Sequence, residues 1–115
     1  MMNKINAVCV YSASSTKIDS VYFETARELG TLLARNDIRV VNGAGNMGLM
    51  AAVSDAALAA GGQVTGVIPR FMVEQNWHHT GLSELIEVDT MHERKQKMAN
   101  LSDGIIALPL SLIHI

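Results

Sequence analysis

The sequence predicts an α/β fold built on a doubly wound parallel sheet, and three observations support this prediction. Short, mostly apolar runs alternate along the chain with longer segments of helical periodicity. Glycine or proline closes several of these segments. A β-branched run leads directly into a G-x-G-x-x-G pattern and then into an alanine-rich segment. Strands that alternate with helices form parallel sheets with right-handed crossovers. We therefore expect an incomplete Rossmann-like sheet of about five strands with alternating helices.

The elements follow from local patterns taken in chain order. The first run, 5–11, is apolar almost throughout, as expected of a strand buried on both faces. The next segment has one apolar face and can be capped by Asp19 or Ser20, so it predicts a helix. The region 71–82 fits either a short helix or an irregular excursion. The predicted strands are 5–11, 38–42, 63–68, 85–88 and 104–108, and the predicted helices are 20–35, 47–60 and 91–101.

Composition limits the classes of function. The 115 residues fit one domain, with 49% hydrophobic residues, 17% charged residues and a net charge of −2. This charge gives no reason to expect nucleic-acid or membrane binding. The stretch 42–69 is poor in charge, but its six glycines argue against a membrane span. The single cysteine, Cys9, cannot form an internal disulfide, and no signal peptide is evident, so we expect a cytoplasmic protein.

The glycine pattern, Gly43, Gly45 and Gly48, is the first candidate binding site. Glycine permits a sharp turn and lets backbone amides approach a ligand, and the following helix start favours an anion. A tight turn without any ligand would leave the same pattern. A dinucleotide fingerprint normally follows the first strand, with an acidic residue about 20 positions later. Here the glycines follow the second strand, and the next strand ends in Pro69-Arg70. A mononucleotide or sugar phosphate therefore fits better than NAD.

A loop of small hydroxyl residues, 12–16, follows the first strand, and Ser14 is our candidate ligand residue within it. In a parallel sheet the carboxyl ends of the strands form the ligand-binding edge. The hydroxyls could donate to a phosphate or cap the next helix.

The helix 91–101 carries an unusual face. Met91, Arg94, Lys95 and Met98 share one side of it. Two cations are expensive to bury without partners. Either their stems extend to water, or the face lines an anionic pocket, where the planar fork of arginine suits a phosphate. Both interpretations remain open at this point.

Two aromatic features have ordinary explanations. The adjacent pair His78-His79 has no third ligand at metal-binding spacing, so we expect surface histidines and no metal site. Trp77 fits a pocket wall and a packed surface position equally well. No cofactor is expected.

Taken together, five collinear blocks resemble the LOG ("lonely guy") family of cytokinin riboside 5′-monophosphate phosphoribohydrolases. Many bacterial members of this family were once labelled lysine decarboxylases. The resemblance runs from Ile5 to Pro109. The blocks are the segments 8–15, 43–50, 66–69, 91–98 and 102–109.

The resemblance implies hydrolysis of the N-glycosidic bond of a nucleoside 5′-monophosphate, such as AMP or a cytokinin riboside monophosphate. The products are free base and ribose 5-phosphate, and members are usually homodimers. It implies substrate binding by Arg94 and Lys95, with Arg94 catalytic and Met91 beside them. The family also uses a P-G-G-x-G-T-x-x-E segment with a catalytic glutamate, of which only Pro109 is present here.

We expect residues 1–109 to be the N-terminal part of one nucleotide-binding domain. Residues 110–115, Leu-Ser-Leu-Ile-His-Ile, are what a transposase adapter end used in DNA library preparation encodes, so we expect an artefactual tail and an inactive fragment. The main alternative is a non-catalytic nucleotide or molybdenum-cofactor carrier on the same fold. A pyridoxal-phosphate decarboxylase is a third candidate, but neither Lys95 nor Lys97 has a supporting motif for a Schiff base.

Overall fold

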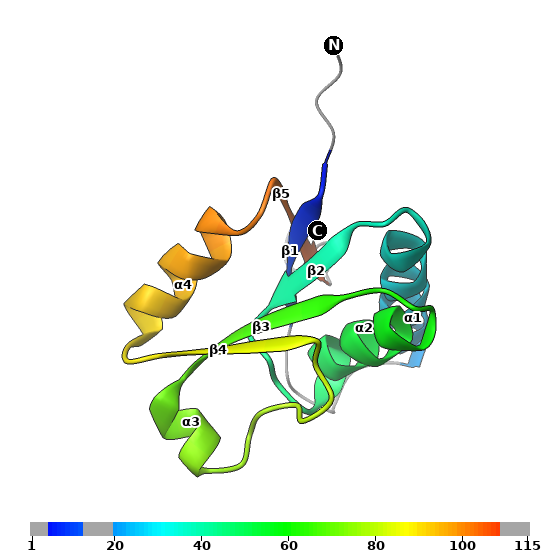
Figure 1. Ribbon diagram of the computed structural model, residues 1–115. Helices are drawn as coiled ribbons and strands as arrows, with labels where there is room; N and C mark the ends of the chain where they lie inside the picture. Colours follow the sequence, from blue (N-terminus) through cyan, green and yellow to red (C-terminus); the bar gives the residue numbers. More distant parts are fainter. Residues whose placement is uncertain (1–4, 13–19, 109–115) are drawn as a thin grey trace, which may run out of the picture.

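A computed structural model describes residues 5–12 and 20–108 of the chain. In this part, five strands alternate with four helices, as the sequence predicts (Figure 1). The strands are β1 (Ala7–Ser12), β2 (Arg39–Asn42), β3 (Val64–Pro69), β4 (Glu84–Val88) and β5 (Gly104–Leu108). The helices are α1 (Ser20–Arg35), α2 (Gly48–Ala59), α3 (Arg70–Glu74) and α4 (Met91–Asn100).

The sheet is parallel throughout, in the order β4-β3-β2-β1-β5. The register pairs Cys9 of β1 with Val41 on one side and Ile105 on the other. The chain therefore builds outward from β1 to β4 and then returns to the far side of β1 through α4. All strands end at one edge, where loops from several strands can meet a ligand. The predicted doubly wound α/β sheet is confirmed.

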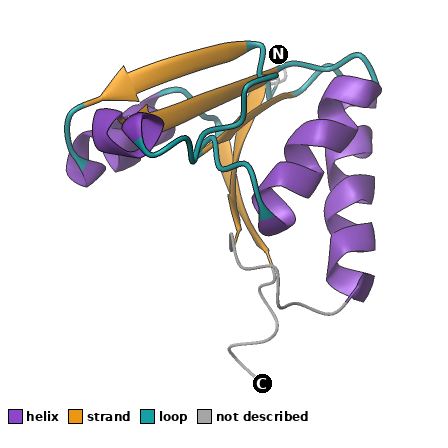
Figure 2. Cartoon of the chain, turned by 90° about the horizontal axis from the view of Figure 1, so that it is seen from below, coloured by secondary structure: helices purple, strands orange, loops and turns teal. Residues whose placement is uncertain are grey.

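The two faces of the sheet have separate cores. Helices α1 and α2 lie side by side against one face, away from α4, which covers part of the other (Figures 1 and 2). Val40, Leu49 and Val53 belong to the core under α1 and α2, while Cys9 and Met98 belong to the core under α4. The pair α1 and α2 packs closely because Gly30 has no side chain: a Cβ there would collide with the carbonyl of Val53.

The helix ends follow local chemistry. Helix α2 stops at a glycine turn, where Gly61 has a φ of 82° in the left-handed region that glycine tolerates. Helix α4 begins with a capping box, in which the Thr90 hydroxyl accepts from the Glu93 amide at 3.1 Å. The Glu93 carboxylate accepts from the Thr90 amide at 3.0 Å in return. The ambiguous region resolves into the five-residue α3 followed by an irregular segment.

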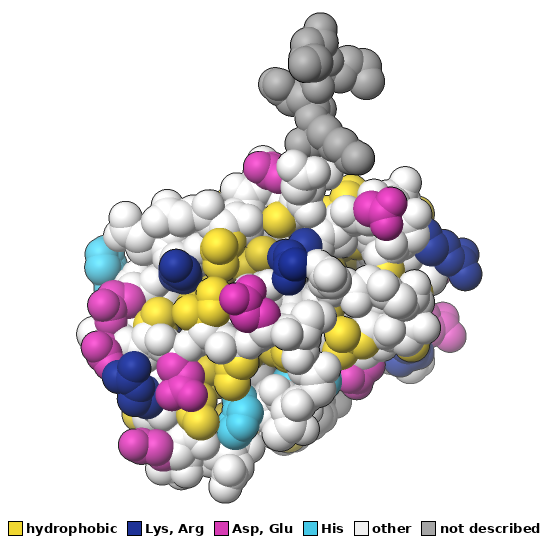
Figure 3. All heavy atoms as spheres, viewed as in Figure 1, with side chains coloured by type: hydrophobic (Ala, Val, Ile, Leu, Met, Phe, Trp, Pro, Cys, Tyr) yellow, Lys and Arg dark blue, Asp and Glu magenta, His cyan; other side chains and the backbone are white. Residues whose placement is uncertain are grey.

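Charge on the surface is mixed in sign. On the face shown in Figure 3, basic and acidic side chains are interspersed around a band of apolar ones. Within the described residues, no helix is both long and apolar enough to span a bilayer.

Candidate functional site

The glycine loop, residues 43–48, lies at the carboxyl end of β2 and is fixed from beneath by a buried asparagine. Asn42 is fully buried, and its Nδ2 donates to Ser54 Oγ at 2.8 Å. Its Oδ1 accepts from the Ala44 amide at 2.9 Å, which forms an Asx turn. Ala44 adopts a φ of 63°, unusual for a residue other than glycine. Asn42 satisfies buried polar groups on two elements, so it sets the shape of the loop.

The loop ends where α2 begins. Gly48 is buried and has a φ of 68°, so this position favours glycine. The preceding Met47 provides no side-chain cap for the helix. The Gly45 amide donates to the sulfur of Met50 at 3.0 Å. A thioether is a weak acceptor, so this amide can exchange its partner for an anionic oxygen.

Arg94 extends from α4 to the end of this loop. Its Nε donates to the Val67 carbonyl at 2.9 Å, and its Nη2 donates to the Gly43 carbonyl. The guanidinium thus joins the residue after β2 and the second half of β3 to α4. Among the described residues, the hydrogen-bond partner of its Nη1 is the sulfur of Met91, at 3.7 Å. This leaves donor capacity for a ligand, since a guanidinium has five N–H groups.

Partial burial changes the electrostatics around Arg94. Burial lowers the pKa of Arg94, and the nearby Tyr11 opposes that shift. Burial raises the pKa of Tyr11, and the Cys9 thiol adds to the rise, whereas Arg94 lowers it. Among the described residues no carboxylate pairs with Arg94, so this half-buried cation gains from an anion that enters the site.

Arg94 lies at the boundary of two adjoining hollows. The larger, of about 590 Å³, is also lined by glycine-loop residues and by Trp77. The smaller, of about 250 Å³, is also lined by Tyr11, Met91 and Lys95. Ser12 lines both, and its buried Oγ has no hydrogen-bond partner among the residues that the structure describes. The remaining walls are apolar: Met47, Met50, Ile68 and Met72 in the larger hollow, and Val10, Met50 and Met98 in the smaller.

Most of the candidate residues gather at this edge of the sheet. Gly43 and Gly45 line the larger hollow, whereas the buried Gly48 shapes the turn beneath it without lining either. On the basic helix face, Arg94 is half-buried at the hollows, while Lys95 and Met91 are exposed at the rim of the smaller one; the binding of an anion there stays a prediction. Ser14 lies outside the described residues.

The expectation of two surface histidines is wrong for His79, whose side chain is only 15% exposed. Its Nδ1 accepts from the Gly81 amide at 2.9 Å, so in the neutral ring Nε2 carries the proton and donates to Asp55 at 2.6 Å. The His79 amide also donates to the Ala44 carbonyl at 2.8 Å. His79 therefore pins the segment 75–81, which we call the strap, to the glycine loop and α2.

Sequence reasoning missed several residues that build the site. Asn42 and Ser54 are distant in sequence and look like ordinary strand and helix residues. The signal for Ser12 was present in the run of hydroxyls, of which the structure describes only this first one. No three His, Cys, Asp or Glu side chains in the described part of the chain gather closely enough to hold a metal ion.

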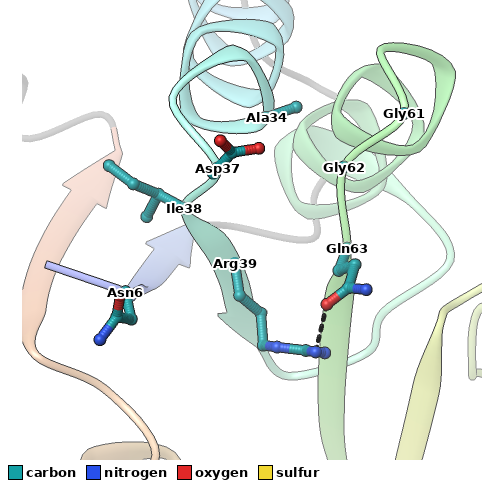
Figure 4. A pocket seen from close by; sticks show the side chains of 8 residues that line it. All are labelled: Asn6, Ala34, Asp37, Ile38, Arg39, Gly61, Gly62 and Gln63. Carbon is teal, nitrogen blue, oxygen red and sulfur yellow. Dashed lines mark hydrogen bonds between the residues drawn. The ribbon is translucent and has the colours of Figure 1, made fainter.

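A separate hollow of about 290 Å³ lies at the opposite, amino-terminal edge of the sheet (Figure 4). Arg39, the basic side chain among the described residues that line it, donates to Thr65 Oγ1 at 2.7 Å and also to Gln63. Asp37 lies on its rim. With its arginine already paired and a carboxylate nearby, this hollow is the weaker anion site.

Comparison with known proteins shows the family of the chain. The family described as "Possible lysine decarboxylase" matches residues 50–109, just over half of the chain. The chain belongs to this family. It is 39% identical to cytokinin riboside 5′-monophosphate phosphoribohydrolase LOG5 of Arabidopsis thaliana, over 93% of this chain and 47% of that protein. It is 40% identical to the protein of that activity from Rhodococcoides fascians, over 90% of this chain and 52% of the relative. The expected LOG resemblance is confirmed.

The chain spans about half the length of these curated relatives. Among solved structures, TM1055 is 25% identical with a TM-score of 0.76, over 89% of this chain and 59% of that one. A molybdenum cofactor carrier protein from Chlamydomonas reinhardtii has the same TM-score at 20% identity, over 90% of this chain and 62% of the carrier. At that identity the second likeness shows a shared fold alone.

Proposed function

We propose that the chain forms the nucleotide-binding part of a hydrolase that cleaves the N-glycosidic bond of a nucleoside 5′-monophosphate. The substrate class is AMP or a cytokinin riboside 5′-monophosphate, and the products are free base and ribose 5-phosphate. The names of the LOG relatives support this reaction. The observation that carries the proposal is the Arg94 guanidinium, which the carbonyls of Gly43 and Val67 hold at the boundary of two hollows.

In this proposal, Arg94 binds the phosphorylated ribose through its free N–H groups and assists the transition state. The Gly45 amide and the Ser12 hydroxyl provide uncharged donors nearby, and Lys95 adds positive charge at the rim. Gly43 contributes by having no side chain: a Cβ would lie 2.8 Å from Arg94 Cζ. Met91 lies beside the guanidinium, with its sulfur 3.7 Å from Nη1.

The chemistry also requires a carboxylate. Cleavage develops positive charge on the ribose, which a nearby carboxylate stabilises while it activates water. The described residues that line the two hollows include no Asp or Glu. We therefore expect residues 1–115 alone to bind nucleotide without turning it over. We further propose that the longer enzyme acts as a homodimer in the cytoplasm.

The test is calorimetric titration of the chain with AMP, ribose 5-phosphate and adenosine. Arg94→Ala should weaken binding of AMP and of ribose 5-phosphate at least tenfold, because hydrogen bonds to a charged group are each worth about 1.5–3 kcal/mol. Adenosine, which has no phosphate, should bind equally to both proteins. Arg70→Ala is the matched control, since Arg70 is an exposed arginine paired with Glu87 and Asp89 away from the hollows. Equal AMP affinity in Arg94→Ala would remove Arg94 from the site.

A base-release assay distinguishes the hydrolase from a carrier. In a version of the chain that carries the P-G-G-x-G-T-x-x-E segment, a hydrolase releases adenine from AMP, and Arg94→Ala abolishes that release. Tight binding without release would favour the carrier.

A further inference from the structure

Trp77 is a large aromatic side chain that the fold leaves 52% exposed, at the wall of the larger hollow. Arg94, Ser12, Gly43 and Met50 line both hollows, whereas Trp77 lines the larger one only. The indole therefore lies away from the boundary where Arg94 sits. A ligand that fills the larger hollow meets a cation at one part and an aromatic ring at another.

The backbone on both sides of Trp77 is tied to the glycine loop. The Asn76 carbonyl accepts from Asn46 Nδ2 at 3.2 Å, and His78 forms an isolated antiparallel bridge with Gly45. The Trp77 amide itself donates to the Met72 carbonyl at 3.1 Å. Asn76 adopts a φ of 61°, which turns the chain sharply just before the indole. Asn76 takes the left-handed position that ends α3, which asparagine tolerates, and the contacts with the glycine loop then hold Trp77 beside it.

The side chains that line the larger hollow limit the kinds of ligand that it can bind. Among the described residues that line it, Arg94 is the single charged side chain. The others are three thioethers, Ile68, Trp77, two glycines and the uncharged polar Ser12 and Asn46. Its volume of about 590 Å³ falls within the range of roughly 300–1,000 Å³ that is common for small-molecule sites. The hollow therefore suits a ligand with an anionic end and a flat, weakly polar end. Exposed aromatic rings at such sites stack on planar bases.

We propose that Trp77 is the platform on which the base of the nucleotide stacks, and that it selects ligands with a planar aromatic base over the bare sugar phosphate. This inference rests on the proposed function, since it names which part of that substrate the strap binds. Arg94 binds the ribose phosphate, and Trp77 binds the base that is attached to the ribose. The strap makes this possible by tying the two binding elements to one loop.

The experiment uses the intrinsic fluorescence of the chain, because Trp77 is its only tryptophan. The chain is titrated with AMP and with ribose 5-phosphate, and binding of each is measured in parallel by calorimetry. AMP should quench the emission with the same dissociation constant that calorimetry gives. Ribose 5-phosphate should bind without quenching.

Variants test the same point independently. Trp77→Leu should weaken AMP binding about tenfold, which corresponds to about 1.4 kcal/mol of stacking, and should change binding of ribose 5-phosphate less than twofold. Trp77→Phe should retain most of the AMP affinity. Phe71→Leu is the matched control: Phe71 is 48% exposed on the adjoining α3 but does not line either hollow. It should leave both affinities unchanged.

The outcomes separate this inference from the proposed function. If AMP binds without quenching, or if Trp77→Leu weakens AMP and ribose 5-phosphate equally, the stacking role is overturned while nucleotide binding stands. If AMP does not bind at all, both proposals fail. An emission shift that depends on protein concentration and not on nucleotide would place a second copy of the chain on Trp77, which also overturns the stacking role.

Discussion

Replacing Gly43 with alanine should move Arg94 rather than break the fold. The φ of Gly43 is not in the left-handed region, so its backbone accepts alanine. The new Cβ would lie 2.8 Å from Arg94 Cζ and closer still to Nη2. Because the obstructing atoms are the far end of a flexible side chain, the guanidinium can swing away. It then loses its bonds to the carbonyls of Gly43 and Val67.

The magnitude follows from those two bonds. Hydrogen bonds to charged groups contribute about 1.5–3 kcal/mol each. Arg94 is only partly buried and regains water when displaced, so we expect a total loss of about 1–3 kcal/mol in the free energy of unfolding. For a domain of this size that corresponds to a fall of roughly 3–12 °C in Tm.

A double-mutant cycle tests the reasoning. Urea unfolding is measured for the original chain, Gly43→Ala, Arg94→Ala and the double variant. With Arg94 already truncated, Gly43→Ala has nothing to displace and should cost less than about 0.5 kcal/mol. AMP binding should fall in both single variants and no further in the double variant. If the two stability losses simply add, the contact between Gly43 and Arg94 does not explain the glycine, and the argument for a preformed guanidinium fails.

Three further predictions concern the supports of the site. Gly66→Ala should lower the free energy of unfolding, measured with urea, by about 1–3 kcal/mol, because a Cβ there would lie 2.5 Å from neighbouring side-chain carbons. Gly104→Ala is the control and should leave it unchanged, because there is open space around Gly104. His79→Ala should accelerate amide hydrogen exchange at Gly81, with little change in exchange of the sheet amides; equal acceleration everywhere would contradict a local pin. Burial raises the pKa of the Cys9 thiol above its ordinary value. The free energy of unfolding should therefore be constant at pH values below the ordinary thiol pKa and fall as the pH rises above it. Cys9→Ala should flatten that fall in urea unfolding measured across this pH range.

Much of the fold could be predicted because its signals are local. Buried parallel strands read as apolar runs, and glycine or proline marks the ends of the elements, so most predicted bounds lie within two residues of those observed. The capping box Thr90-x-x-Glu93 also lies within one turn and indicates where α4 begins. The short α3 was ambiguous because five residues are too few to show helical periodicity.

The site was predicted only in part, because its contacts join residues far apart in sequence. The hydrogen bond from Arg94 to the Gly43 carbonyl joins residues 51 positions apart. No local sequence pattern indicates that an arginine will donate to a particular backbone carbonyl. The strap, too, could not be predicted from local sequence. Two adjacent histidines in a polar segment suggest solvent exposure, whereas tertiary contacts with Asp55 and Ala44 bury most of the His79 side chain.

The sulfur atoms around the hollows also make the site sensitive to oxidants. Met47 and Met91 are each about half exposed at its walls, at 53% and 49%. Peroxide converts a thioether to a sulfoxide, which is polar and chiral, and reductases can reverse this change. Mild peroxide treatment should therefore weaken AMP binding while the circular dichroism of the sheet stays unchanged. The affinity for AMP would then depend on how much oxidant the protein has met, without any change in its amino-acid sequence.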